Sequence, residues 1–318
     1  MKDTAACSKG RNKLSNKNKG YIFIITASIL FAMIGIFGKL AMQTGIGPFE
    51  LLVYQYALMA ALSGAWLAAA RPRSLRVPRR DLVHMVIQGL IGTGGTTILY
   101  YLALDRINVG IASMLLFTYP VFVNVFFMAS GIRAITRIGK WALGIAFAGS
   151  LLVLDVLNIG LAGLSAAGVV FGLLSSICYA FYNTYADLKL SSVPPAVICF
   201  YTSLAAMTEG LILMPSIVAS PPAVDVELVL YLIMLSVVSG ILPVLLIYRG
   251  IAWIGADKAS IVSCSELPLT IILAYFALGE QMNMLQLVGV ALVIAAVLLL
   301  HRSDGADGIG TGAEDIEA

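Results

Sequence analysis

Two acidic residues of this sequence stand out because each lies within a long apolar run. Glu266 and Glu209 have no charged neighbours nearby in sequence. An ionisable side chain at the centre of a membrane helix costs roughly 2.5–3.5 kcal/mol, so it usually faces a cavity or a partner. Either carboxylate could therefore bind a cationic group or exchange a proton. The structural alternative for both is a neutral acid that is bonded to a neighbouring helix.

Several other side chains could contribute to a binding site in an apolar setting. Lys39 lies near the end of the first apolar run, where it could reach lipid headgroups, pair with Glu50 or contact a substrate carboxylate. Tyr119 precedes Pro120, and Glu266 lies shortly before Pro268, so both stand where proline loosens a helix. The further polar and aromatic candidates for lining a cavity are Asn124, Gln55, Tyr100, Tyr179 and Asn183.

The residue pattern argues against an enzyme. The only histidines are His84 and His301, and there is no HExxH metal motif and no nucleophile motif in a suitable context. The glycine-rich stretch GLIGTGGTTILYY lacks the Lys-Ser/Thr ending of a phosphate loop, so it is interpreted as a packing helix. The four cysteines form no CxxC pair, which predicts free thiols. We expect no catalytic residue, cofactor or metal.

The elements that position these residues are apolar helices. Of the 318 residues, 60% are hydrophobic and 12% are charged, whereas a soluble domain carries about 25% charged residues. A bilayer-spanning helix needs about 20 apolar residues. The sequence therefore predicts an all-α membrane protein with ten transmembrane helices, near 20–43, 48–70, 82–104, 107–129, 138–156, 163–186, 196–219, 228–251, 258–279 and 284–301.

The basic residues indicate the orientation of these spans. Lys and Arg concentrate in the tail 1–19 and in the loop 71–80, and almost all of them fall on one side of the ten spans. By the positive-inside rule both termini are cytoplasmic. Topology explains these basic runs, so we expect no nucleic-acid partner. The Gly-rich, acidic segment 303–318 is predicted to be a disordered tail.

The chain also contains an internal repeat. An offset of 147 residues superimposes Tyr101 on Tyr248 and lays YLALDRINVGIASMLLFTYP over YRGIAWIGADKASIVSCSEL without a gap. This predicts two units, 20–156 and 157–302. Each has five spans, an odd number, so the second unit is inverted relative to the first. Inverted repeats are typical of secondary transporters, which bind substrate near the midplane between the repeats. The offset pairs Tyr119 with Glu266, so we expect the site where these two broken helices meet.

The second unit contains the most recognisable stretch, ADKASIVSCSELPLTIILAYFALGEQMNMLQLVGVALVIAAVLLL. Its Glu266, Gly279, Glu280, Gln286 and Gly289 resemble the pattern of EamA-type carriers of the drug/metabolite transporter superfamily. The resemblance covers roughly residues 20–301 and implies ten spans in two inverted five-span repeats.

Several positions depart from that family pattern, among them Arg133, which occupies the first-repeat position equivalent to Glu280. Gln55 occupies a position where the family often has arginine, and the proline that usually follows the glutamate directly is shifted to Pro268. The substrate is therefore not indicated by the resemblance.

These observations together predict a secondary transporter of small metabolites or amphipathic organic solutes in the inner membrane, working by alternating access. Export is the direction that the resemblance implies, and import and exchange stay open. The expected partners are a small-molecule solute and the lipid bilayer, with proton coupling and a homodimer as open alternatives. The competing hypothesis is a polytopic membrane sensor or scaffold that does not transport.

Overall fold

The computed structural model describes residues 18–107, 109–133, 135–153, 165–219, 225–269 and 283–310. This part of the chain is helical and contains no strand. Eight helices in it are long and apolar enough to cross a membrane: Asn18–Gln43, Pro48–Ala70, Arg79–Leu104, Ile111–Ser130, Ala166–Leu190, Pro195–Leu213, Val226–Ile254 and Met284–Arg302. The fifth predicted span is also helical over Arg137–Val153, and its last residues, like the second part of the ninth span, lie outside the described residues. The predicted all-α membrane fold is confirmed.

The first repeat begins with the span Asn18–Gln43, in which a turn at residues 32–33 precedes α2. A 3₁₀ turn, Pro72–Leu75, connects its second and third spans. Its helices are α2 (Ile34–Gln43), α3 (Pro48–Ala70), α4 (Arg79–Ile87), α5 (Thr96–Leu104), α6 (Val109–Leu116), α7 (Tyr119–Ser130) and α8 (Arg137–Val153).

The second repeat follows the same order of spans. Asp225 caps the helix of its third span, since its side chain accepts a hydrogen bond from the Leu228 amide at 2.7 Å. Its helices are α9 (Ala166–Tyr185), α10 (Pro195–Leu213), α11 (Ser216–Ala219), α12 (Val226–Ile233), α13 (Leu242–Ile254), α14 (Ala256–Ser263) and α16 (Met284–Gly310). Helix α16 continues to Gly310, so it runs past position 303, where the sequence predicts a disordered tail to begin.

The two repeats interrupt their helices at matching places. The turn between α6 and α7 covers residues 117–118, and the turn after α14 covers residues 264–265, which is the offset that the internal repeat predicts. The third span of each repeat contains a π-helical segment, Gln88–Gly95 in the first and Met234–Ile241 in the second. π-Helical turns are rare and occur frequently at functional sites.

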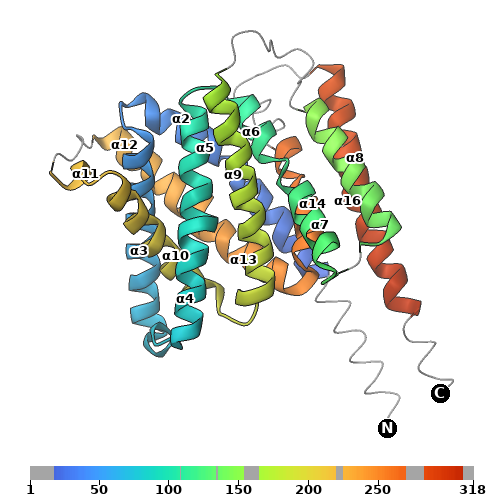
Figure 1. Ribbon diagram of the computed structural model, residues 1–318, viewed down its shortest axis with the longest axis horizontal. Coiled ribbons are helices and arrows are strands. Elements are labelled where there is room, and N and C mark those ends of the chain that lie inside the picture. Colours follow the sequence, from blue (N-terminus) through green and yellow to red (C-terminus); the bar gives the residue numbers. More distant parts are fainter. Residues whose placement is uncertain are drawn as a thin grey trace.

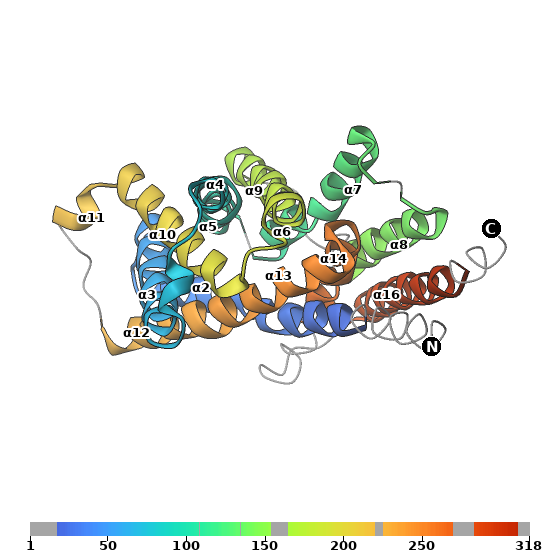
Figure 2. The same cartoon turned by 90° about the horizontal axis from the view of Figure 1, so that it is seen from below.

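Helices α8 and α16, the last spans of the two repeats, lie side by side at one end of the molecule (Figure 1, Figure 2). Gly149 and Gly289 make this close approach feasible, because a Cβ on Gly149 would meet the Gly289 carbonyl oxygen at 2.9 Å. Helices α3 and α10 lie at the opposite end, with α12 beside α3.

The GxxxG pair Gly168 and Gly172 is used for packing inside the chain. Gly168 faces Ile107 and Gly172 faces Leu115, and a Cβ on either glycine would be too close to these side chains. This face of α9 is therefore occupied and is not the contact for a homodimer. Cys178, Cys199 and Cys264 are free thiols, as the sequence predicts.

Candidate functional site

The described helices enclose a cavity between the two repeats. Its interior leaves about 100 Å³ for the centres of water-sized molecules. Pockets for small organic ligands are mostly apolar, with few polar groups. The polar and aromatic residues of its lining include Gln55, Tyr56, Thr93, Thr96, Thr97, Tyr100, Tyr101, Phe117, Tyr179, Tyr182, Ser239 and Glu266.

The irregular segments of the two repeats converge on this cavity. Thr93 comes from the π-helical segment of the first repeat, and Ser239 comes from that of the second. Phe117 lies in the turn between α6 and α7, and Glu266 lies directly after the matching turn in the second repeat. Interrupted helices that line a cavity are where membrane transporters bind their substrates and coupling ions.

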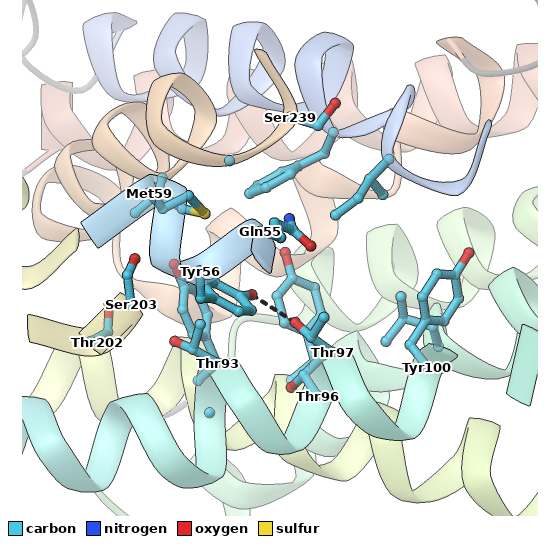
Figure 3. A pocket seen from close by; sticks show the side chains of 18 of the residues that line it. Gln55, Tyr56, Met59, Thr93, Thr96, Thr97, Tyr100, Thr202, Ser203 and Ser239 are labelled. Carbon is cyan, nitrogen blue, oxygen red and sulfur yellow. Dashed lines mark hydrogen bonds between the residues drawn. The ribbon is translucent and has the colours of Figure 1, made fainter. Parts of the chain in front are cut away.

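Hydrogen bonds between neighbouring helices fix the wall of the cavity. The Tyr56 hydroxyl on α3 shares a hydrogen bond of 2.7 Å with the Thr97 hydroxyl on α5 (Figure 3). The Tyr101 hydroxyl donates to the Gln55 side-chain oxygen at 2.6 Å. The Tyr100 hydroxyl lies 3.0 Å from the Ser113 hydroxyl on α6. These bonds hold α3, α5 and α6 together around the space.

Three serine and threonine hydroxyl groups of the lining are buried and have no hydrogen-bond partner among the described residues. They belong to Thr93, Thr96 and Ser239. Buried polar groups in proteins are almost always bonded to protein or to ordered water. These hydroxyls are therefore available to water or to a bound solute.

Glu266 is the one acidic residue of the described lining, which contains no Lys, Arg or His. Its side chain is 9% exposed. Tyr179 lies close by on α9, where its ring stacks 5.5 Å from that of Tyr182. The site therefore combines one carboxylate with aromatic rings and hydroxyl groups.

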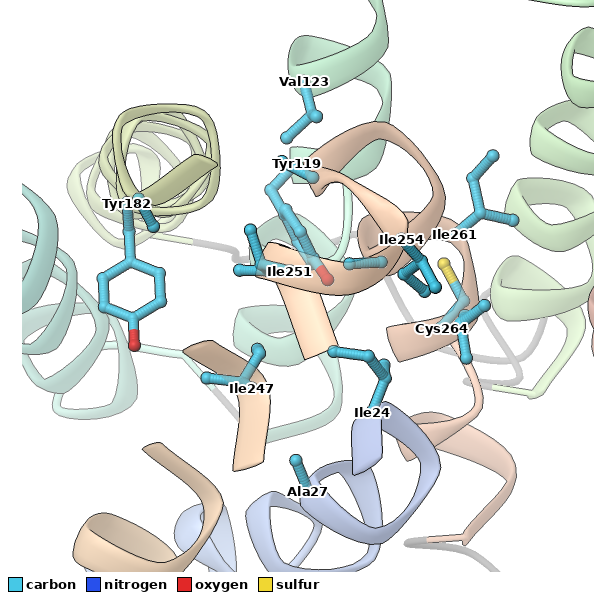
Figure 4. Packing of buried hydrophobic residues seen from close by; sticks show 14 of the residues in the cluster. Ile24, Ala27, Tyr119, Val123, Tyr182, Ile247, Ile251, Ile254, Ile261 and Cys264 are labelled. Atoms are coloured by element: carbon cyan, nitrogen blue, oxygen red, sulfur yellow. The ribbon is translucent and has the colours of Figure 1, made fainter. Parts of the chain in front are cut away.

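Four of the sequence-predicted site residues line the cavity: Glu266, Gln55, Tyr100 and Tyr179. Tyr119 and Asn124 are fully buried beside it instead. Tyr119 points from α7 toward Ile251 and Ile254 (Figure 4), and its hydroxyl donates to the Ser260 carbonyl at 3.3 Å. Asn124 donates to Pro120 at 2.7 Å and to the Ser260 hydroxyl at 3.4 Å. Both side chains therefore join α7 to α14, so the broken helices of the two repeats do contact each other.

The other three candidates lie apart from the cavity lining. Asn183 is fully buried and donates to the Tyr179 carbonyl at 2.8 Å within its own helix. Glu209 on α10 lies against Gly94, where a Cβ would collide with the carboxylate, and its Oε2 has no hydrogen-bond partner among the described residues. Lys39 is exposed. The Glu50 carboxylate accepts a hydrogen bond from the Gly47 amide at the start of α3, and no ion pair between Glu50 and Lys39 is present in the described structure.

The sequence does not indicate that the hydroxyl groups of the cavity belong to a binding site. Thr93, Thr96 and Thr97 belong to the glycine-rich stretch that was interpreted as a packing helix. An i→i+5 turn shifts the direction in which later side chains point, so the face that meets the cavity does not follow ordinary helical spacing. The high content of Gly and Thr in this stretch is the feature of the sequence that could have indicated a polar cavity wall.

A second polar cluster lies outside the cavity, where the ends of three helices meet. Arg133, in the loop after α7, places Nη1 2.9 Å from Asp187 and 2.6 Å from Asp257. Asp187 also accepts a hydrogen bond of 3.0 Å from the Ala256 amide. Burial lowers the pKa of the Arg133 guanidinium, but Asp257 and Asp187 more than offset this, so its pKa lies above the ordinary value for arginine.

Comparison with solved structures supports the fold. A known crystal structure has a TM-score of 0.69 at 18% sequence identity, and the match covers 88% of this chain and 96% of that one.

The curated relatives are named as transporters. The chain is 24% identical to the uncharacterized inner membrane transporter YicL of Salmonella typhimurium, over 90% of this chain and 96% of that protein. It is 25% identical to the uncharacterized transporter YcbK of Bacillus subtilis, over 88% of this chain and 91% of that protein. An uncharacterized transporter of Synechocystis is 29% identical over 72% of this chain and 71% of its own length.

The model of the EamA-like transporter family matches residues 18–155 and, a second time, residues 166–302. These two matches cover most of the chain. The double match agrees with two repeats, with a membrane-embedded helical fold and with a role in transport rather than in catalysis. The protein therefore belongs to the EamA-like transporter family.

Proposed function

We propose that the protein is a secondary carrier that moves a small metabolite or amphipathic organic solute across the inner membrane by alternating access. The observation that carries this proposal is the convergence of matched irregular segments, one set from each repeat, on one cavity. Two inverted units that exchange conformations would expose such a cavity first to one side and then to the other.

The proposal also includes the orientation of the protein in the membrane and the direction of transport. The concentration of Lys and Arg supports cytoplasmic termini, and the name of the Salmonella relative supports the inner membrane. We propose export as the direction, on the family resemblance. A sensor or scaffold would not need a cavity that irregular segments of both repeats line, so the cavity favours the carrier.

Proton coupling through Glu266 is the proposed source of energy, because this carboxylate is the acidic group in the described cavity lining. Glu209 is the second candidate, since its Oε2 is buried and has no hydrogen-bond partner in the described part of the chain. A carboxylate that binds a proton and the solute in alternation would couple proton movement to solute movement across the membrane.

The experiment that tests this function is uptake of a labelled metabolite mixture into proteoliposomes, with and without a pH gradient. We expect the wild type to accumulate at least one solute above protein-free liposomes, faster with the gradient. Glu266→Gln is expected to lose the response to the gradient. If the gradient response is unchanged in both Glu266→Gln and Glu209→Gln, the coupling proposal is wrong. If no solute accumulates, the sensor or scaffold hypothesis is favoured.

The Arg133 cluster is proposed to hold the cytoplasmic ends of α7, α9 and α14 together in this conformation. The Arg133 side chain is 38% exposed and the two carboxylates are 10% exposed, so water partly screens these ion pairs, which are worth about 1 kcal/mol. We therefore expect Arg133→Ala to speed amide hydrogen exchange at the α13–α14 junction by up to about fivefold. The matched control is Arg137→Ala, which removes an exposed arginine that forms no ion pair in the described structure. Equal exchange in the two variants would contradict the proposal.

A further inference from the structure

We propose that the solute of this carrier is a flat organic cation with a single positive charge, which places its charge at Glu266 and its rings among the tyrosines of the cavity. This inference rests on the proposed function and specifies its substrate class. Three features of the cavity support it independently: its charge, its aromatic wall and its unpartnered hydroxyl groups.

The charge of the lining discriminates against anions. Glu266 is the one carboxylate in the described lining, and no Lys, Arg or His accompanies it there. A charge that leaves water for an apolar site is costly unless an opposite charge or hydrogen bonds compensate it. An anion would meet a carboxylate and no cation, whereas a monocation would meet its counter-charge. One carboxylate compensates one positive charge, so a dication is disfavoured as well.

The aromatic wall suits a flat cationic body. Tyr56, Tyr101 and Phe117 line the space together with the pair Tyr179 and Tyr182, whose rings stack at 28° between their planes. The face of an aromatic ring attracts an organic cation, and the attraction grows as the cation loses water. Offset stacking on these rings would also hold an uncharged part of the solute in place.

The hydroxyl groups define where polar atoms of the solute can bind. Those of Thr93, Thr96 and Ser239 have no hydrogen-bond partner among the described residues and come from the two π-helical spans. A hydroxyl group both donates and accepts, so these three sites accommodate an N–H group, an oxygen or a retained water. They add orientation without adding charge.

The test uses three probes with the same bicyclic aromatic frame and different charge with the purified full-length protein: N-methylquinolinium, quinoline and naphthoate at neutral pH. Binding is measured by equilibrium dialysis, with protein-free detergent as the blank. We expect N-methylquinolinium to bind about tenfold or more tightly than quinoline and naphthoate not to bind saturably. Glu266→Gln should weaken binding of the cation about tenfold or more but that of quinoline less than about twofold.

Two variants control for damage to the fold. Glu227→Gln removes an exposed acid of α12 whose side chain accepts a hydrogen bond from Tyr231 outside the cavity, and it should leave all three affinities unchanged. Glu266→Asp keeps the charge and should weaken binding of the cation less than Glu266→Gln does.

Several outcomes would overturn the inference. It is wrong if naphthoate binds as tightly as the cation, if Glu266→Gln weakens binding of the cation and quinoline equally, or if no probe binds. The proposed function is judged separately by the metabolite mixture. Accumulation of a solute that is not a cation would uphold the carrier and reject this substrate class. Cation binding without accumulation of any solute would uphold the site and reject the carrier.

Discussion

Gly289→Ala is expected to lower the free energy of unfolding by about 1–3 kcal/mol, the usual cost of overpacking a close contact. A Cβ on Gly289 would lie 2.5 Å from the Val153 amide nitrogen and 2.7 Å from the Gly149 carbonyl oxygen. The nearest of these neighbours belong to the backbone of α8, so they cannot move aside without shifting the helix. Because α8 and α16 are the last spans of the two repeats, the added methyl group should push the repeats apart.

The measurement is the melting temperature of the purified protein in one detergent, with Gly144→Ala as the matched control. Gly144 lies on α8, and a Cβ there has nothing within 4 Å. Alanine favours helix by about 1 kcal/mol over glycine, so Gly144→Ala should melt at the same or a higher temperature. If Gly289→Ala melts no lower than Gly144→Ala, the close packing of α8 on α16 is not as described.

Thr97→Trp is expected to reduce solute uptake by roughly 5- to 150-fold, which corresponds to overpacking of about 1–3 kcal/mol at the binding site. Thr97 lies on α5, and its hydroxyl points toward Tyr56 across the cavity wall (Figure 3). A tryptophan side chain there would occupy space that the solute needs. Uptake is measured in proteoliposomes with the solute that the metabolite mixture identifies.

Two smaller substitutions at the same position separate filling of the cavity from loss of the hydrogen bond. Thr97→Val removes the bond to Tyr56 at similar volume, at a cost of about 1 kcal/mol. Thr97→Ser keeps the hydroxyl group. Both should retain most of the uptake. A Thr97→Trp variant that folds and transports like the wild type would show that the solute does not pass through this cavity.

The membrane-spanning helices could be predicted from the sequence because bilayer thickness imposes long apolar runs. The run near 48–70 coincides with α3, Pro48–Ala70, since Pro48 begins the helix and Arg71 follows its end. The interrupted helices also followed from the sequence. The same offset that superimposes Tyr101 on Tyr248 superimposes the two turns.

The contents of the cavity could be predicted only in part. Glu266 was found because a buried carboxylate is costly and therefore conspicuous. Thr93 and Ser239 could not be predicted as site residues, because burying a hydroxyl group in a membrane helix costs little free energy. The π-helical segments also change the side of the helix that these two side chains face. The contact of Arg133 with Asp187 and Asp257 joins residues far apart in the chain, and no local spacing indicates it.

The most direct test of alternating access is the accessibility of one cavity position from both sides of the membrane. Thr97→Cys would be introduced into a variant that lacks Cys7, Cys178, Cys199 and Cys264. A membrane-impermeant maleimide is then added to right-side-out and to inside-out vesicles. The proposed carrier predicts labelling from either side, with the balance between the two sides shifted by solute and by the pH gradient. Labelling from one side alone, whatever the solute or gradient, would contradict it.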